Sequence, residues 1–235
     1  MLHKIALACT ILMGSAVMLG CQAPEEDSCN IKTPGVFVEY EVHEEGGSAA
    51  TRATFWVGDK PGGTFLSFGS CGDSIAVNGK TLTKVSAGDH DAYETSMTAV
   101  DSYEFIFSRD GETPYSSAVA PRNPVAITAP AGNASVSRAA AFDITWDAND
   151  SGSLNLLVSG DCIKDFPSTL GESVTDNGTY AVNANGIEPF VSSDSGKSCT
   201  ATLELNRQNT GTLSSSLKGT IEGNSLAHAS FTSAP

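Results

Sequence analysis

The chain has 235 residues, with 27 Asp and Glu against 13 Lys and Arg, and a formal net charge of −14. This acidity argues against nucleic acid as a partner, because phosphates are bound by clustered Lys and Arg, and it would repel a bare anionic lipid surface. The hydrophobic fraction of 40% is sufficient for packed cores. The length fits one large domain or two domains of about 100 residues.

Residues 1–20 have the pattern of a signal peptide. Lys4 carries the positive charge, and residues 5–20 are apolar or small, a core shorter than a comfortable membrane span. Residues 18–21, Met-Leu-Gly-Cys, resemble the bacterial lipobox. The resemblance implies cleavage before Cys21 and lipidation of its thiol and new amino group. An ordinary secretory signal with a chance cysteine is the alternative.

The residues after Cys21 set the expected location. Gln22 stands where Asp is the usual inner-membrane retention signal, so we expect an outer-membrane lipoprotein. Several acyl chains such as palmitate anchor stably, because each buried CH₂ contributes roughly 0.8 kcal/mol. Residues 21–28 contain Pro24 and the acidic run 25–27, and this composition predicts a lipidated, solvated tether.

Four cysteines remain beyond the signal peptide and Cys21: Cys29, Cys71, Cys162 and Cys199. An even number in an exported protein indicates disulfides. Of the three possible connectivities we favour Cys29–Cys71 and Cys162–Cys199, because each pair then lies within one proposed domain. A zinc site is the rival, but the chain has no CxxC motif and its histidines are isolated. We therefore predict no metal site.

The body of the chain has the periodicity of β-strands. Residues 36–42 alternate between apolar and acidic side chains, and residues 51–57 form a second such segment. The dipeptide Asn78-Gly79 predicts a hairpin between residues 74–77 and 80–85. Later strands are expected at residues 103–107, 142–146, 154–158, 180–182, 201–205 and 226–231. No capped amphipathic helix of ten residues is found after the signal peptide, which favours an all-β fold.

Two tandem β-sandwich domains are expected, at residues 29–120 and 124–235. Pro121 is preceded by Ala120 and Pro124 follows closely, which is typical of a short, stiff linker. In the second half, residues 127–130 and 142–146 resemble immunoglobulin-like or fibronectin-like modules of bacterial surface proteins. The pattern departs from antibody domains, since Trp146 precedes both cysteines of its half. Such modules imply binding, spacing or assembly more often than catalysis.

Constant sequence offsets suggest an internal duplication. Trp56 and Trp146 are 90 residues apart, and Cys71 and Cys162 are 91 apart. Trp56 nevertheless alternates in phase with Arg52, which places both on the polar face of their strand. A Trp beside an Arg on such a face is a candidate binding face for a sugar ring or a partner protein. The alternative is that Trp56 is a core residue like Trp146.

Catalytic and ligand motifs are incomplete. The triplets Gly79-Lys80-Thr81 and Gly196-Lys197-Ser198 lack the earlier glycine of a phosphate loop, so no nucleotide is expected. Residues 171–175 nearly match GxSxG but end in Thr. Residues 147–152 match the first half of a calcium loop, but Val158 stands where a Glu is required, which favours a polar turn. We predict no catalytic residue and no cofactor.

These observations lead to three hypotheses about function. The first is a lipid-anchored envelope protein that acts as a non-catalytic binding or adhesion module for an envelope protein or a glycan. The second is a structural spacer or an assembly accessory of an envelope complex. The third, which we favour least, is a hydrolase. An exposed aromatic patch favours the first, featureless polar faces favour the second, and a cleft with convergent titratable groups favours the third.

Overall fold

The computed structural model describes residues 24–69, 71–87, 90–148, 150–166 and 171–235. Within these ranges the chain forms β-strands and three short 3₁₀ helices, Ser28–Asn30, Thr33–Gly35 and Ser192–Asp194. The predicted all-β class is therefore confirmed. No helix in the described ranges is long and apolar enough to span a membrane. The expected signal peptide and Cys21 lie outside the described residues.

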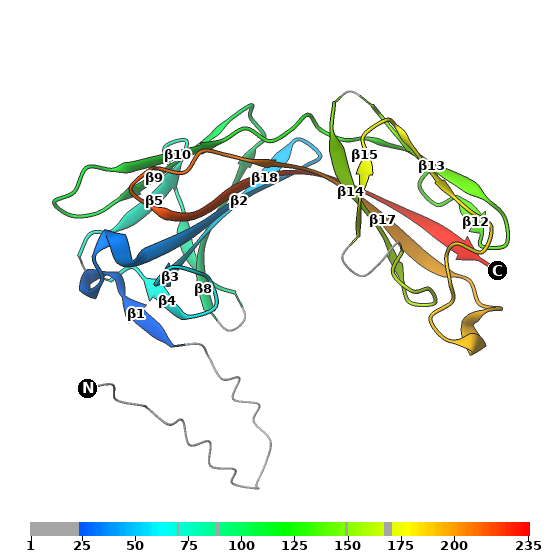
Figure 1. Ribbon diagram of the computed structural model, residues 1–235, viewed down its shortest axis with the longest axis horizontal. Helices are drawn as coiled ribbons and strands as arrows, with labels where there is room; N and C mark the ends of the chain where they lie inside the picture. Colours follow the sequence, from blue (N-terminus) through cyan, green and yellow to red (C-terminus); the bar gives the residue numbers. More distant parts are fainter. Residues whose placement is uncertain (1–23, 70, 88–89, 149, 167–170) are drawn as a thin grey trace, which may run out of the picture.

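One long sheet runs through the molecule (Figure 1). Its central strand is β18, Lys218–Ala234, which pairs antiparallel with β17, Cys199–Thr210, and parallel with β2, Val36–Glu45. The strand order is β1-β4-β3-β2-β18-β17-β14-β15, with β8 also paired to β3, β7 to β8 and β12 to β18. The other members are β1 Glu25–Asp27, β3 Ser48–Val57, β4 Thr64–Ser67, β7 Thr83–Ala87, β8 His90–Thr98, β12 Ser135–Ser137, β14 Ser153–Gly160 and β15 Glu172–Thr175.

Two small sheets cover one face of this long sheet, one at each end (Figure 1). The first has the order β10-β9-β5-β6 and the second the order β11-β13-β16. Ile221 is buried in the core under the first and Phe231 in the core under the second. Because side chains alternate along a strand, residues ten apart on β18 point to the same side. The bounds are β5 Ser74–Val77, β6 Lys80–Thr81, β9 Tyr103–Ser108, β10 Tyr115–Val119, β11 Ile127–Ala129, β13 Phe142–Trp146 and β16 Thr179–Val182.

The strand order of each sandwich is immunoglobulin-like. In the first, β2-β3-β8-β7 faces β5-β9-β10, which is the ABED against CFG arrangement of a constant-type domain. In the second, β11-β13-β16 faces β12-β18-β17-β14-β15, which corresponds to ABE against A′GFCC′. The predicted immunoglobulin-like sandwiches are confirmed by this topology.

The two sandwiches share strand β18, so the C-terminal part of the chain also completes the first core. Leu217 and Ile221 are buried there, although the sequence assigned them to residues 124–235. The first half of β18 lies very close to its neighbour β2 at Gly219. There φ is +140°, and a Cβ atom would collide with the carbonyl oxygen of Val38. Only glycine fits this conformation and this approach.

The tether prediction is wrong for its second half. Glu25–Asp27 form strand β1, which runs parallel to β4, and the Phe65 N–H donates to the Pro24 carbonyl oxygen at 2.9 Å. Ser28, which follows, is fully buried. The acidic run is therefore part of the long sheet, because its backbone pairs with β4 irrespective of side-chain polarity.

The predicted Asn-Gly turn and the predicted cysteine pairing are confirmed, but the second strand of the hairpin pairs with β5 only over Lys80–Thr81, and Thr83–Ala87 pairs with β8 in the long sheet. Asn78 and Gly79 have positive φ angles of 47° and 77° and join β5 to β6. Two disulfides are present, Cys29–Cys71 with a Cα–Cα distance of 5.6 Å and Cys162–Cys199 with 5.8 Å. Cys29–Cys71 joins the 3₁₀ helix Ser28–Asn30 to the loop after β4, and Cys162–Cys199 joins the loop after β14 to the start of β17.

Candidate binding groove

Trp56 lies on the outer face of β3, as its phase predicted, but its side chain lacks the exposure that the candidate binding face requires. The side chain is only 9% exposed. Its indole N–H donates to Glu39 Oε2 at 2.6 Å, and its ring lies 3.8 Å from the ring of Phe65 on β4. The short strand β4 pairs with this end of β3, and its Phe65 side chain packs against the indole. The sequence alternation alone does not reveal such a cover.

Arg52, the second residue of the expected binding face, is engaged with its neighbours on β8. Its Nη2 group donates to His90 Nε2 at 3.1 Å, and its Nε group lies 3.7 Å from a carboxylate oxygen of Glu94. Arg52 and Trp56 therefore do not combine into an open aromatic surface. The structure brings them to one face, but each is tied to a different strand.

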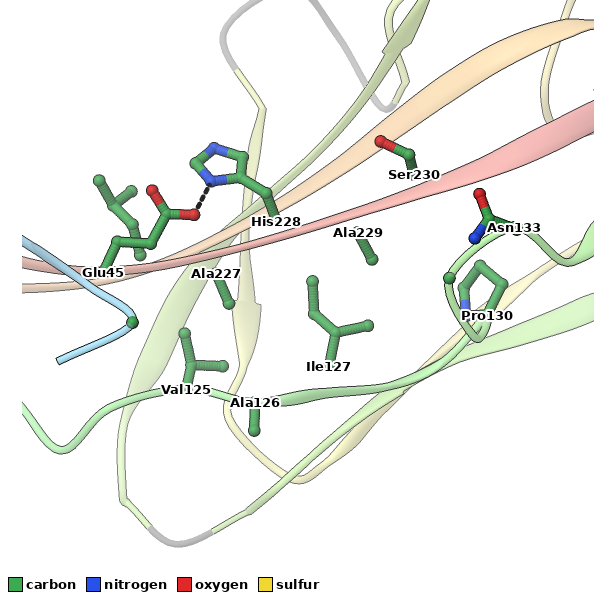
Figure 2. Close-up of a pocket in the computed structure, with 13 residues that line it drawn as sticks. Glu45, Val125, Ala126, Ile127, Pro130, Asn133, Ala227, His228, Ala229 and Ser230 are labelled. Carbon is green, nitrogen blue, oxygen red and sulfur yellow. Dashed lines mark hydrogen bonds and ion pairs between the residues drawn. The ribbon is translucent and has the colours of Figure 1, made fainter.

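A groove of about 580 Å³ lies between β18 and the segment 125–133 (Figure 2). Ala227 and Ala229 point from β18 toward Val125 and Ile127, and His228 lies on the opposite side of the strand (Figure 2). The groove thus has an apolar floor and a polar rim. The lining residues are Glu45, Gly46, Val125, Ala126, Ile127, Pro130, Gly132, Asn133, Leu226, Ala227, His228, Ala229 and Ser230.

The groove coincides with a gap in the pairing of β18. Pairing with β2 ends at Ser225, and pairing with β12 begins at Thr232. Between these points β17 covers one edge of β18 and no strand of the described chain covers the other. One bond crosses the gap, from the Asn133 N–H to the Ser230 carbonyl oxygen at 2.8 Å.

Ladder geometry identifies the backbone groups that this gap leaves open. Along a strand, successive residues direct their N–H and C=O groups to alternate sides. The Ile221 carbonyl oxygen faces β17, where it accepts from the Gly211 N–H at 2.9 Å, so the backbone groups of even-numbered residues of β18 face the gap. The carbonyl of Leu226, both groups of His228 and the N–H of Ser230 have no backbone partner in the described parts of the chain.

The gap arises because the chain changes sheets beside it. Ile127 pairs with Trp146 in the small sheet, and only at Ser135 does the chain join β18. Between them Asn133 adopts a positive φ of 64°, a conformation that Asn tolerates better than most residues. The crossing segment therefore passes alongside β18 without pairing to residues 226–229.

A histidine between two carboxylates closes one end of the groove. His228 Nδ1 lies 2.7 Å from Glu45 Oε1, and its Nε2 lies 3.2 Å from Glu204 Oε2. Burial opposes the charged ring, but the hydrogen bonds to the two carboxylates outweigh it and raise the pKa of His228. Both ring nitrogens lie beside a carboxylate, an arrangement that favours the protonated ring, which can donate to both.

The arrangement does not suit a metal ion. Among the described residues, the group with metal-ligand spacing is Asp27, Cys29 and Cys71, and these two cysteines are bonded to each other. The calcium-like segment 147–152 is also neutralised by arginine. The Arg122 guanidinium lies 2.9 Å from the Asp150 carboxylate. It therefore occupies the side of this carboxylate where a calcium ion would bind.

Comparisons with known proteins give little to add to this geometry. No protein-family model matches the chain, and no curated protein matches it. Among solved structures, the crystal structure of DIP-gamma IG1+IG2 matches at 7% identity, covering 85% of this chain and 95% of that chain with a TM-score of 0.22. At that TM-score the match supports no conclusion, and the immunoglobulin-like assignment rests on the strand order.

The sequence analysis did not single out the groove residues. His228, Glu204 and Glu45 were isolated in the sequence, and Glu45 is 183 residues away from its partner His228. The alternation in β17 and β18 places His228 and Glu204 on one polar face, so that half of the cluster had a readable signal. The parallel pairing of β2 with β18, which brings Glu45, had none.

Proposed function

We propose that this protein is a lipid-anchored component of the bacterial cell envelope that acts as a non-catalytic binding module, with its partner held in the groove beside β18. The single observation that carries the proposal is the open edge of β18 at the junction of two sandwiches. Unpaired strand edges are recognition sites unless they are covered or blocked. The two disulfides are compatible with a location outside the cytoplasm.

The proposed anchor is the lipidated Cys21 in the outer membrane. Cys21 lies four residues before Glu25, the first residue of β1. An extended segment of four residues spans at most about 14 Å, so the first sandwich would sit close to the membrane surface. The partner in this setting is an envelope protein or a glycan, without nucleic acid, nucleotide or cofactor.

The groove chemistry supports binding in preference to catalysis. Its titratable groups are Glu45 and His228, which pair with each other, and Glu204 pairs with the second nitrogen of the same ring. General acid–base work needs a group that is free to take up or release a proton beside the substrate. An imidazole with carboxylates on both nitrogens stabilises the loop at Glu45 and offers no such group.

A spacer or assembly role is the second candidate, and the shared sheet favours it. β18 pairs with β2 of the first sandwich and with β17 of the second, so the two sandwiches are joined by backbone hydrogen bonds and not only by a linker. Such a fused pair would hold two attached components at a fixed separation. This role needs no open groove.

Two experiments test the proposal. Globomycin should accumulate the uncleaved precursor, and Cys21→Ser should release the protein from membranes; a processed Cys21→Ser protein that stays membrane-bound would contradict the anchor. For the binding module, a photo-reactive residue replaces Ser230 at the groove or, as a control, Thr220 on the outer face of the same strand. Adducts in intact cells should form from position 230 and not from position 220, and equal labelling would argue for the spacer.

A further inference from the structure

We propose that the groove binds an extended segment of a partner protein, which adds to the sheet as a strand between β2 and β12 and carries a basic residue at the Glu45 end. This inference rests on the proposed function and specifies the class of its partner. It follows from the position of the gap, from the open backbone groups and from the charge of the rim.

The gap in the pairing of β18 has the length of a short strand. Residues 226–231 of β18 lie between the two parallel neighbours β2 and β12. At about 3.3 Å per residue, six residues extend roughly 20 Å. Both neighbours run parallel to β18, so an incoming strand of about five residues in the same direction continues a line of pairing that the protein already uses on either side.

The open backbone groups supply the main-chain part of the recognition. The His228 N–H and C=O, the Leu226 C=O and the Ser230 N–H face the gap, two donors and two acceptors in ladder order. In strand addition these bonds give affinity irrespective of sequence, and the pockets for alternate side chains give specificity. Donors and acceptors in alternation fit a polypeptide backbone better than they fit a sugar hydroxyl pattern.

The two sides of the groove dictate the side-chain pattern of the ligand. An added strand turns one set of side chains toward Val125, Ile127 and Ala227, which form the apolar floor. It turns the alternate set toward the rim at His228 and Ser230. The expected segment therefore alternates small apolar and polar residues.

Charge favours a basic residue at one end of that segment. Glu45 and Glu204 both flank His228, so even the protonated ring leaves an excess negative charge. The whole chain carries −14, which steers a cationic segment toward the groove. Glycan binding is disfavoured, because no Phe, Tyr or Trp lines the groove to stack on a sugar ring.

The test uses the full chain exported with Cys21→Ser and a fluorescein-labelled seven-residue peptide of alternating valine and threonine with one lysine. The key variant is His228→Pro, which removes an N–H that faces the gap and not β17, so the sheet itself keeps its bonds. His228→Ala is the matched control, since it removes the ring and keeps the N–H. We expect His228→Pro to weaken peptide binding about tenfold or more and His228→Ala to change it less than about threefold.

Peptide chemistry provides a second measurement that does not depend on folding of the variant. N-methylation of the peptide at the positions that face β18 should abolish binding to the unmodified protein, whereas methylation at the alternate positions should not. Replacing the lysine by glutamate should weaken binding about threefold to tenfold. Equal binding by both N-methylated forms, retained binding by a folded His228→Pro protein, or binding of chitin oligosaccharides but not peptides would overturn the proposal.

The outcomes separate this inference from the proposed function. If position 230 captures an envelope component in cells while His228→Pro leaves the capture unchanged, the binding module stands and the strand-addition mechanism is wrong. If neither position is labelled and the peptide does not bind at millimolar concentration, both are wrong.

Discussion

Arg207 donates to both carboxylate oxygens of Asp176, from Nε at 2.7 Å and from Nη2 at 3.0 Å, with both side chains fully buried. Asp176 also accepts from the indole N–H of Trp146 at 2.8 Å. The Nη1 group of Arg207 holds the carbonyl oxygen of Pro124 at 2.8 Å. One ion pair therefore fastens the chain between the sandwiches to the core of the second.

Replacing Arg207 should be among the most damaging single changes in the second sandwich. Arg207→Met leaves the carboxylate of Asp176 buried without its main partner, which costs about 3–5 kcal/mol of unfolding free energy. Urea unfolding measures this cost. The double variant Arg207→Met with Asp176→Asn removes both charges and should recover part of the loss. A single-variant loss under about 1 kcal/mol would contradict the structural role of the pair.

The two tryptophans should differ in their contribution to stability. Trp146 is buried in the second core and hydrogen-bonded to Asp176, so Trp146→Ala should cost about 3–5 kcal/mol. Trp56 packs on the outer face of the sheet against Phe65. Removing its side chain there leaves a surface depression that water can fill, not a closed cavity. We expect Trp56→Ala to cost less, and denaturant midpoints of the two variants provide the comparison. Equal losses of stability would mean that Trp56 contributes as much as a core residue, although it lies on the outer face.

The docking of strand β1 should weaken at low pH. The hydrogen bonds from Lys84 and Ser67 lower the pKa of Glu25 from 4.5 to about 2. A lowered folded-state pKa contributes stability that is fully present above pH 4.5 and is lost as the pH falls toward 2. Because the side chains of this pair are partly exposed, the contribution is under about 1 kcal/mol.

Amide hydrogen exchange of residues 25–27 measures this docking. Glu25→Gln should increase exchange at pH 7 and should remove the acid-dependent rise that the unmodified protein shows below pH 4.5. Lys84→Met should act in the same direction, since it removes the cation that pairs with Glu25 at 2.8 Å. Exchange in β1 that is independent of both substitutions would show that backbone pairing to β4 holds the strand alone.

How far the fold could be read from the sequence depended on whether the signal was local. The alternation in residues 36–42 and the Asn78-Gly79 turn act over short range, and the strand and the turn predicted from them are confirmed. The two disulfides join cysteines 42 and 37 residues apart, and their pairing was predicted because each pair lies within one proposed domain. The 90-residue offset also has a structural counterpart: Trp56 and Trp146 each lie at the end of the strand in the B position of their sandwich, β3 and β13.

Long-range pairing set the features that the sequence did not indicate. The sharing of β18 by two sandwiches depends on its parallel pairing with β2, whose residues are about 180 positions away. The cover on Trp56 depends on β4 returning to the end of β3. The groove depends on a strand being absent between β2 and β12. None of these arrangements leaves a periodic pattern in the chain.

A buried hydroxyl in the first core should be dispensable. Tyr40 is 1% exposed and its ring stacks on Phe105 at 4.7 Å, but its hydroxyl has no hydrogen-bond partner among the described residues. An unpartnered buried hydroxyl costs about 1–3 kcal/mol, so Tyr40→Phe should leave stability unchanged or raise it. The matched control is Tyr103→Phe, since the Tyr103 hydroxyl donates to Glu44 at 2.6 Å. Destabilisation by Tyr40→Phe comparable to that of Tyr103→Phe would indicate a partner.

The ion pairs of His228 with Glu45 and Glu204 should make the Glu45 end of the groove less stable as the pH rises. The folded-state pKa of His228 is raised above 6.5, against the opposing effect of burial, by Glu45 and Glu204. A raised pKa contributes stability that is fully present below pH 6.5 and is lost as the pH rises through the folded-state pKa.

The NMR titration of the His228 ring should therefore give a midpoint above 6.5. Glu45→Gln and Glu204→Gln should each lower it, and the double variant should lower it further. Because Glu45 is the last residue of β2, next to the β2–β3 turn, and His228 lies on β18, loss of the charge should also increase amide exchange at Gly46. A titration midpoint at or below 6.5 in the unmodified protein would mean that burial outweighs the two carboxylates and that the loop is held by other contacts.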